Sequence, residues 1–147
     1  VWDYPRPPAM RRDGRMVEVR VGGVVIARSS RAYKIMETAS PPTFYIPRAD
    51  IDFDLLEPVS DTTYCEWKGT ATYWALARCS AEPVAWCYER PRPRFEAIKG
   101  HLAFYPGRVD CRLDGEPVKT QPGRFYGGWI TSDVVGPFKG EPGTGHW

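Results

Sequence analysis

Proline and glycine interrupt this chain so often that we expect many turns and few long helices. Fifteen prolines and fourteen glycines are spread over 147 residues, which is about a fifth of the sequence. Each proline removes a backbone N–H donor and fixes φ, and glycine clusters favour turns. The segments between these breakers are short, and several alternate apolar with polar residues as half-buried strands do. The sequence therefore predicts a mainly β fold of antiparallel sheets with short helical turns.

The clearest strand pair surrounds two consecutive glycines. Residues 16–21 alternate strictly, with three valines on one face, and an apolar run over 24–27 follows Gly22-Gly23. A type I′ hairpin turn needs positive φ at both central positions, which two glycines supply without strain. We therefore expect a β-hairpin here.

A three-stranded meander is expected further along the chain, over residues 64–68, 70–77 and 84–88, with Gly69 as a bulge or kink. Residues 50–56 fit either a strand or a single helical turn. Residues 32–37 fit either a strand or a helix, and the strand is favoured. The remaining expected strands are 43–46, 102–105 and 109–113, with turns at Pro106-Gly107 and Asp114-Gly115.

Length and charge set broad limits on function. The chain fits a single domain over residues 1–147 with an irregular tail over 136–147. A net charge of +2 is too small to predict nucleic acid as a partner. The arginines of residues 90–94 alternate with prolines, which predicts an extended, solvated linker. We expect no membrane span or leader peptide and place the protein in the cytoplasm by default.

The four cysteines do not form metal knuckles. Cys65, Cys79, Cys87 and Cys111 are separated by 14, 8 and 24 positions, so there is no C-x-x-C pair. A structural zinc site needs two ligands close together on a turn. We expect free, buried thiols, no metal and no cofactor.

Aromatic residues supply the candidate binding site. They gather in three strand-like segments, residues 64–69, 85–88 and 125–129, each of which contains a tryptophan. Trp67, Trp86 and Trp129 could form flat apolar walls around a small ligand, or they could all fill the core. On a strand, Cys87 points away from Trp86.

Two charged residues lie inside otherwise apolar stretches. Lys68 follows Trp67, and Glu37 follows a run of mostly apolar residues. A buried lysine is costly unless a carboxylate pairs with it. Lys68 could pair with Glu37 or with Glu66 to join strands, or Lys68 and Glu37 could orient the polar atoms of a ligand.

Three aspartates offer a different chemistry. Asp50, Asp52 and Asp54 would share one face if this segment were a strand, and could then hold magnesium for nucleotidyl transfer. The chain has no glycine-rich phosphate loop. A solvated strand face or a helix cap explains these acids better.

Five motifs together resemble the domain of unknown function 427 family over about residues 1–140. The motifs are residues 1–8, 36–38, 63–69, 103–107 and 125–129. The resemblance implies a small single-domain protein with a fold similar to the β-tent of methionine sulfoxide reductase B and cereblon. Some catalogues give this family a nucleotidyltransferase label, but the family has no settled activity. The resemblance implies the fold more strongly than the function.

These observations favour a β domain that binds a small molecule or a short peptide-like group. Trp67, Trp86 and Trp129 would wall the pocket, and Lys68 and Glu37 would orient the ligand. One alternative is a magnesium-dependent nucleotidyltransferase that uses Asp52 and Asp54. Another is a structural or interaction protein whose rings are all core. The oligomeric state is left open.

Overall fold

The computed structural model describes residues 8–37, 40–65, 68–77, 82–121, 127–134 and 136. Within these ranges the protein is mainly β, as predicted, and its longest helical element has six residues. The strands are β1 (Ala9–Asp13), β2 (Val17–Val21), β3 (Val24–Ser29), β4 (Ala32–Met36), β5 (Thr43–Tyr45), β6 (Leu56–Cys65), β7 (Gly69–Leu76), β8 (Pro83–Cys87), β9 (Leu102–Phe104), β10 (Asp110–Leu113), β11 (Glu116–Pro117), β12 (Lys119–Thr120) and β13 (Trp129–Ile130). Three 3₁₀ turns join them: η1 (Arg48–Asp50), η2 (Phe53–Leu55) and η3 (Pro93–Ile98). The predicted tail lies outside the described residues, apart from Gly136.

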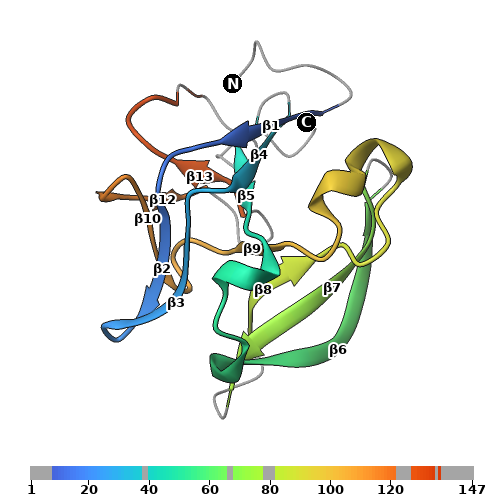
Figure 1. The fold of residues 1–147 in the computed structure, drawn as a ribbon, viewed down its shortest axis with the longest axis horizontal. Coiled ribbons are helices and arrows are strands. Elements are labelled where there is room, and N and C mark those ends of the chain that lie inside the picture. Colours follow the sequence, from blue (N-terminus) through green and yellow to red (C-terminus); the bar gives the residue numbers. More distant parts are fainter. Residues whose placement is uncertain are drawn as a thin grey trace.

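The strands form small antiparallel sheets. One has the order β1-β4-β5, a second β11-β10-β2-β3, a third β6-β7-β8-β9, and β12 pairs with β13. Figure 1 shows the β2–β3 hairpin and the β6–β7 pair on opposite sides of the molecule, with β5 and β9 between them. Backbone hydrogen bonds between Ile46 and Leu102, at 2.8 and 3.0 Å, join the end of β5 to β9. The first and third sheets are therefore coupled through their backbones.

The glycine-centred hairpin is confirmed. Gly22 and Gly23 have φ of +54° and +82° between β2 and β3, as a type I′ turn requires. Asp114 and Gly115, at +49° and +82°, make the corresponding turn between β10 and β11. The predicted turn at Pro106-Gly107 also forms, but β9 and β10, on either side of it, belong to different sheets.

The predicted meander is confirmed as β6-β7-β8, with β9 added at its edge. Residues 50–56 form mostly 3₁₀ turns, and β6 then starts at Leu56. Pro58 is tolerated because β6 is an edge strand, where a missing N–H disrupts no ladder on the open side. The first strand was predicted too far along the chain: β6 spans Leu56–Cys65 rather than 64–68, and Lys68 lies in the turn before β7.

Strands β8 and β9 are buried on both faces, because their alternate residues enter two different clusters. Ala85 and Cys87 join the larger cluster, which also contains Val17 and Val19 of β2. Trp86 joins the smaller cluster. The prediction that Cys87 and Trp86 point to opposite faces of the sheet is confirmed. Strands β8 and β9 therefore form the partition between the two cores.

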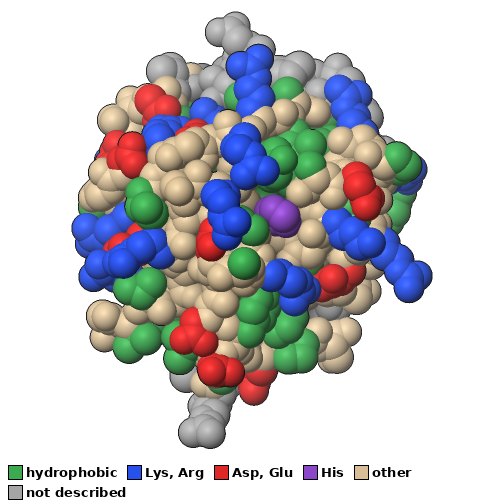
Figure 2. Space-filling model, in the orientation of Figure 1, with side chains coloured by type: hydrophobic (Ala, Val, Ile, Leu, Met, Phe, Trp, Pro, Cys, Tyr) green, Lys and Arg blue, Asp and Glu red, His purple; other side chains and the backbone are tan. Residues whose placement is uncertain are grey.

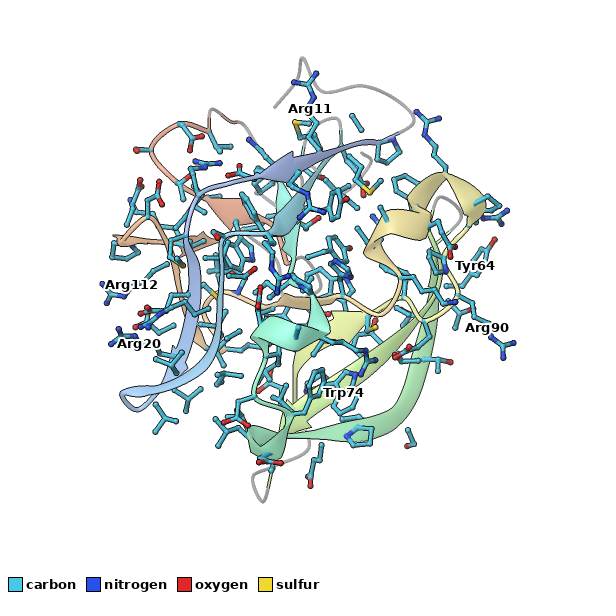
Figure 3. The ribbon with its side chains drawn as sticks, viewed as in Figure 1. Arg11, Arg20, Tyr64, Trp74, Arg90 and Arg112 are labelled. Carbon is cyan, nitrogen blue, oxygen red and sulfur yellow. The ribbon has the colours of Figure 1, made fainter. Side chains whose placement is uncertain are left out.

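Seven of the twelve arginines in the described ranges have carboxylate partners. Figure 2 shows Lys and Arg side chains interspersed with Asp and Glu on the visible face. The pairs are Arg15–Asp13, Arg20–Glu18, Arg28–Glu18, Arg31–Asp50, Arg48–Glu89, Arg108–Glu82 and Arg112–Asp110. Figure 3 shows Arg20 and Arg112, from adjacent strands, projecting outward from the sheet.

The arginine–proline run differs partly from its prediction. Pro93 and Arg94 begin η3, which was not expected, because proline is well tolerated in the first turn of a helix. Pro91 is buried, whereas the arginines on either side are exposed.

Among the helices of the described segments, none is long and apolar enough to cross a membrane.

Candidate functional site

A cavity of about 440 Å³ lies between the β4–β5 pair and the β6-β7-β8 sheet. Its walls are mostly aromatic and hydroxyl-bearing side chains, with one ion pair. The lining residues are Ile35, Glu37, Ser40, Pro41, Thr43, Tyr45, Thr63, Tyr64, Lys68, Tyr73, Trp86, Tyr88, Tyr105, Gln121, Gly127 and Gly128. A volume of this size suits a small molecule.

Strand alternation explains which rings face the cavity. Tyr73 and Trp86 are register partners on β7 and β8, so their side chains lie on the same face of the sheet. Tyr88, two residues after Trp86, also lines the cavity. From the opposite wall, Tyr45 of β5 meets the Trp86 ring edge-on, with centroids 6.1 Å apart. The cavity is thus a meeting point of two sheets.

Trp86 is held on several sides. Its Nε1 donates to the Tyr45 hydroxyl at 3.0 Å, and its ring lies 4.6 Å from that of Tyr105. The Gly127 backbone closes the third side so tightly that a Cβ at this position would lie 2.3 Å from Cη2 of Trp86. Only glycine permits this approach, which makes the indole a rigid wall.

Lys68 and Glu37 form the ion pair that the sequence predicted as one of two options. The Lys68 Nζ donates to Oε1 of Glu37. The Lys68 side chain is 8% exposed and that of Glu37 is 34% exposed, so the cation is deep and the anion faces solvent. The ammonium also lies 5.9 Å from the centroid of the Tyr88 ring. Glu66, the other candidate partner, is outside the described residues.

Hydroxyl groups line another part of the cavity. Thr63 Oγ1 and the Tyr73 hydroxyl are 2.6 Å apart, and Tyr73 also hydrogen-bonds Tyr105. Burial, together with the nearby Tyr73 phenol, raises the pKa of Tyr105 to about 12. The Arg108 guanidinium lies over the Tyr105 ring, 4.1 Å from its centroid. Tyr105 is therefore a neutral phenol at physiological pH.

Tyr64 forms an accessible rim. It is 64% exposed, and Arg92 donates a hydrogen bond to its hydroxyl. Figure 3 shows Tyr64 at the outer side of β6, near the segment that carries Arg90. A ligand entering beside β6 would pass this ring.

The predicted trio of tryptophans does not share one cavity. Trp86 lines it, whereas Trp129 is fully buried in the larger core, against Phe44 at a centroid distance of 5.1 Å. Trp129 Nε1 donates to the Phe104 carbonyl at 3.0 Å. The expectation that Trp129 walls the pocket is wrong, because it packs against the opposite face of the β8–β9 partition. Trp67 lies outside the described residues.

The three aspartates do not converge. Asp50 accepts hydrogen bonds from Ser29 at 2.6 Å and from Arg31 at 2.6 Å. Asp52 caps η2 by accepting from the Asp54 backbone N–H at 3.1 Å. The cap interpretation therefore holds for Asp52. In the part of the chain that the structure describes, no three metal-ligating side chains gather at one point.

The two cysteines whose side chains are described are buried free thiols. Burial is the main cause that raises the pKa of Cys87 to about 12, and it also raises the pKa of Cys111. Glu89 lies 3.4 Å from the Cys87 sulfur and further disfavours the thiolate. Neither thiol is suited to act as a nucleophile.

Sequence reasoning missed the tyrosines that complete the cavity. Tyr88 could have been found from Trp86 by strand alternation. Tyr73 and Tyr105 become neighbours of Trp86 only through the pairing of β7 with β8 and the path of the chain after β9. No local signal predicts that proximity.

Comparison with known proteins gives a family but no curated relative. No curated protein matches the chain. A family model described as "Domain of unknown function (DUF427)", with the label NTP_transf_9, matches residues 9–115. That range includes Glu37, Lys68 and Trp86 of the cavity and strands β1 to β10. The chain belongs to this family of domains of unknown function.

Proposed function

We propose that this domain binds a small molecule, or a short peptide-like group, in the aromatic cavity. The observation that carries the proposal is the convergence of Glu37, Lys68 and Trp86, from three distant segments, on one hollow of about 440 Å³. Rings would contact the flat faces of the ligand, and the ion pair would fix its polar end.

The cavity has the composition of a binding site rather than of unfilled core. It is lined by five tyrosines, whose hydroxyls can donate and accept hydrogen bonds, and by one tryptophan. A purely structural domain would gain stability by filling such a volume with aliphatic side chains. Here Gly127 instead keeps the Trp86 ring against the backbone, so the empty volume is preserved beside it.

The β-tent assignment belongs to the same proposal. It is supported by the mainly β, antiparallel architecture and by the way the β4–β5 pair faces the β7–β8 pair across the cavity. A crystal structure whose sheets do not superpose on the β-tent fold would overturn this assignment without affecting the cavity.

Matched tryptophan variants test the binding proposal. Trp86→Phe should weaken the binding of 3-phenylpropanamide, a neutral aromatic probe, because it removes part of the wall and the hydrogen bond to Tyr45. Trp74→Phe is the control, since Trp74 adjoins Tyr73 on β7 and contacts Phe53 instead, at 5.1 Å. Titration calorimetry and amide NMR shifts would measure both.

Equal affinity in the two variants, or NMR shifts remote from the residues that line the cavity, would contradict the proposal. The protein would then be better described as a scaffold whose rings are core.

A further inference from the structure

The arginines without carboxylate partners are concentrated in two short segments. Among the described residues they are Arg11 and Arg12 on β1, and Arg90, Arg92 and Arg94 around the start of η3. Glu89, next to Arg90, pairs with Arg48 instead. Residues 90–94 therefore carry positive charge with which no described carboxylate forms an ion pair.

The backbone of Arg92 is fixed against the turn that carries Lys68. The Arg92 N–H donates to the Lys68 carbonyl at 3.0 Å, and the Arg92 carbonyl accepts from the Phe95 N–H at 2.8 Å. Arg92 also lies between Pro91, which is buried, and Pro93, and its φ of −59° and ψ of 151° are extended. A residue before proline is restricted to such extended conformations. The Arg92 side chain therefore projects from a preorganised position.

The guanidinium of Arg92 reaches the rim of the cavity. It donates to the Tyr64 hydroxyl and lies 5.7 Å from the centroid of the Tyr64 ring. Tyr64 lines the cavity and is exposed, so this cation lies at the accessible end of the hollow. A guanidinium has several N–H donors in a planar fork, and the Tyr64 hydroxyl accepts from one nitrogen. The remaining donors can bind an acceptor that protrudes from the cavity.

We infer that the ligand carries an oxyanion, a carboxylate or a phosphate, on the end that remains at this rim, and that Arg92 binds it. This inference rests on the proposed function and adds a charged outer end to the ligand. Guanidinium suits both oxyanions because its parallel N–H groups can form two hydrogen bonds to either of them. The rim is exposed, so this ion pair strengthens binding only modestly. It selects among ligands that already fit the aromatic cavity.

A purely structural contact is the main alternative for Arg92. The guanidinium could simply cover the exposed Tyr64 ring, as a cation over an aromatic face does. Such a cover needs no anion. It predicts that the loss of the Arg92 charge changes the stability of the protein and affects charged and neutral ligands equally. The two roles therefore differ in whether a substitution at Arg92 alters the preference for an anion.

Three probes with the same aromatic body test the inference: 5-phenylpentanamide, 5-phenylpentanoate and 5-phenylpentyl phosphate. Their flexible alkyl chain lets the ring enter the cavity while the other end reaches the rim. With the wild-type protein, at least one anion should bind about fivefold more tightly than the amide, the upper range for an exposed ion pair. Arg92→Gln should abolish that advantage and leave the amide affinity nearly unchanged. Arg94→Gln is the matched control, because it removes the same charge from the same exposed segment, whereas Arg92 is the residue that bonds Tyr64.

Titration calorimetry would give the affinities, and circular dichroism would establish that each variant is folded. If Arg92→Gln does not fold, the NMR shift of the Arg92 Nε–H signal when the anions bind the wild-type protein decides the question. The tighter of the two anions identifies the oxyanion as carboxylate or phosphate.

Three results would overturn the inference and leave the proposed function intact. They are equal binding of the anions and the amide, an anion advantage that survives in Arg92→Gln, and an equal loss of that advantage in Arg94→Gln. Failure of all three probes to bind would count against both the inference and the proposed function.

Discussion

Replacing Gly127 with alanine should test the closeness of the Trp86 wall directly. The new Cβ would lie 2.3 Å from Cη2 and 2.5 Å from Cζ3 of Trp86, both far inside normal contact distance. The indole cannot retreat easily, because Nε1 bonds Tyr45 at 3.0 Å and Tyr105 lies 4.6 Å away. Overpacking of this kind costs about 1–3 kcal/mol. For a domain of this size each kcal/mol lowers Tm by about 2–4 °C.

A second substitution should relieve the clash. Trp86→Phe removes the outer part of the indole, which contains both clashing atoms. Alone it loses the hydrogen bond to Tyr45 and some packing, about 1–2 kcal/mol. The double variant should then be more stable than the sum of the single effects predicts, by about 1–2 kcal/mol.

Urea unfolding followed by circular dichroism would give all four free energies of unfolding. Gly14→Ala is the control, because a Cβ at Gly14 would meet no atom within 4 Å. It should change stability by no more than about 1 kcal/mol. If the effects of Gly127→Ala and Trp86→Phe add to within about 0.5 kcal/mol, the backbone does not press on the indole as described.

Three further results are expected. Trp129→Ala should cost about 3–5 kcal/mol in unfolding free energy, because the ring is fully buried, and a Tm near wild type would contradict its core assignment. Cys87 should resist thiol reagents at pH 8 until the protein unfolds, because its pKa is raised to about 12; rapid labelling in the native protein would refute this. Arg31 and Ser29 hold the pKa of Asp50 below its ordinary value, so this stabilisation is complete above the unfolded pKa and is lost as pH falls through the folded one, below about pH 4. Asp50→Asn should therefore flatten the acid side of the stability curve, as thermal melts between pH 2 and 6 would measure.

Local rules account for the parts of the fold that the sequence predicted well. The Gly22-Gly23 turn and the alternation of β2 need only φ preferences and a period of two. The 50–56 segment was ambiguous because its acids can cap a turn or line a strand. Asp52 caps η2 with its side chain, whereas η1 follows Pro47 and has no side-chain cap.

The candidate site was predictable only in part. The cost of burying an ammonium indicated a carboxylate partner for Lys68, with Glu37, 31 positions away, as one of two options beside Glu66. Composition could not separate Trp86 from Trp129, since both are buried rings beside strands. What separates them is which face of the β8–β9 partition each ring contacts, and that depends on long-range pairing.

The shared partition also explains how a cavity can persist in a small domain. On β8, Ala85 and Cys87 are fixed by the larger core, so the backbone that carries Trp86 cannot shift to close the hollow. Gly127 blocks the same ring from the other side. Collapse would therefore require disruption of packing in the larger core, at a cost of several kcal/mol by comparison with large core truncations. The larger core thus keeps the cavity open, and the Lys68–Glu37 pair places two opposite charges in the wall of that cavity.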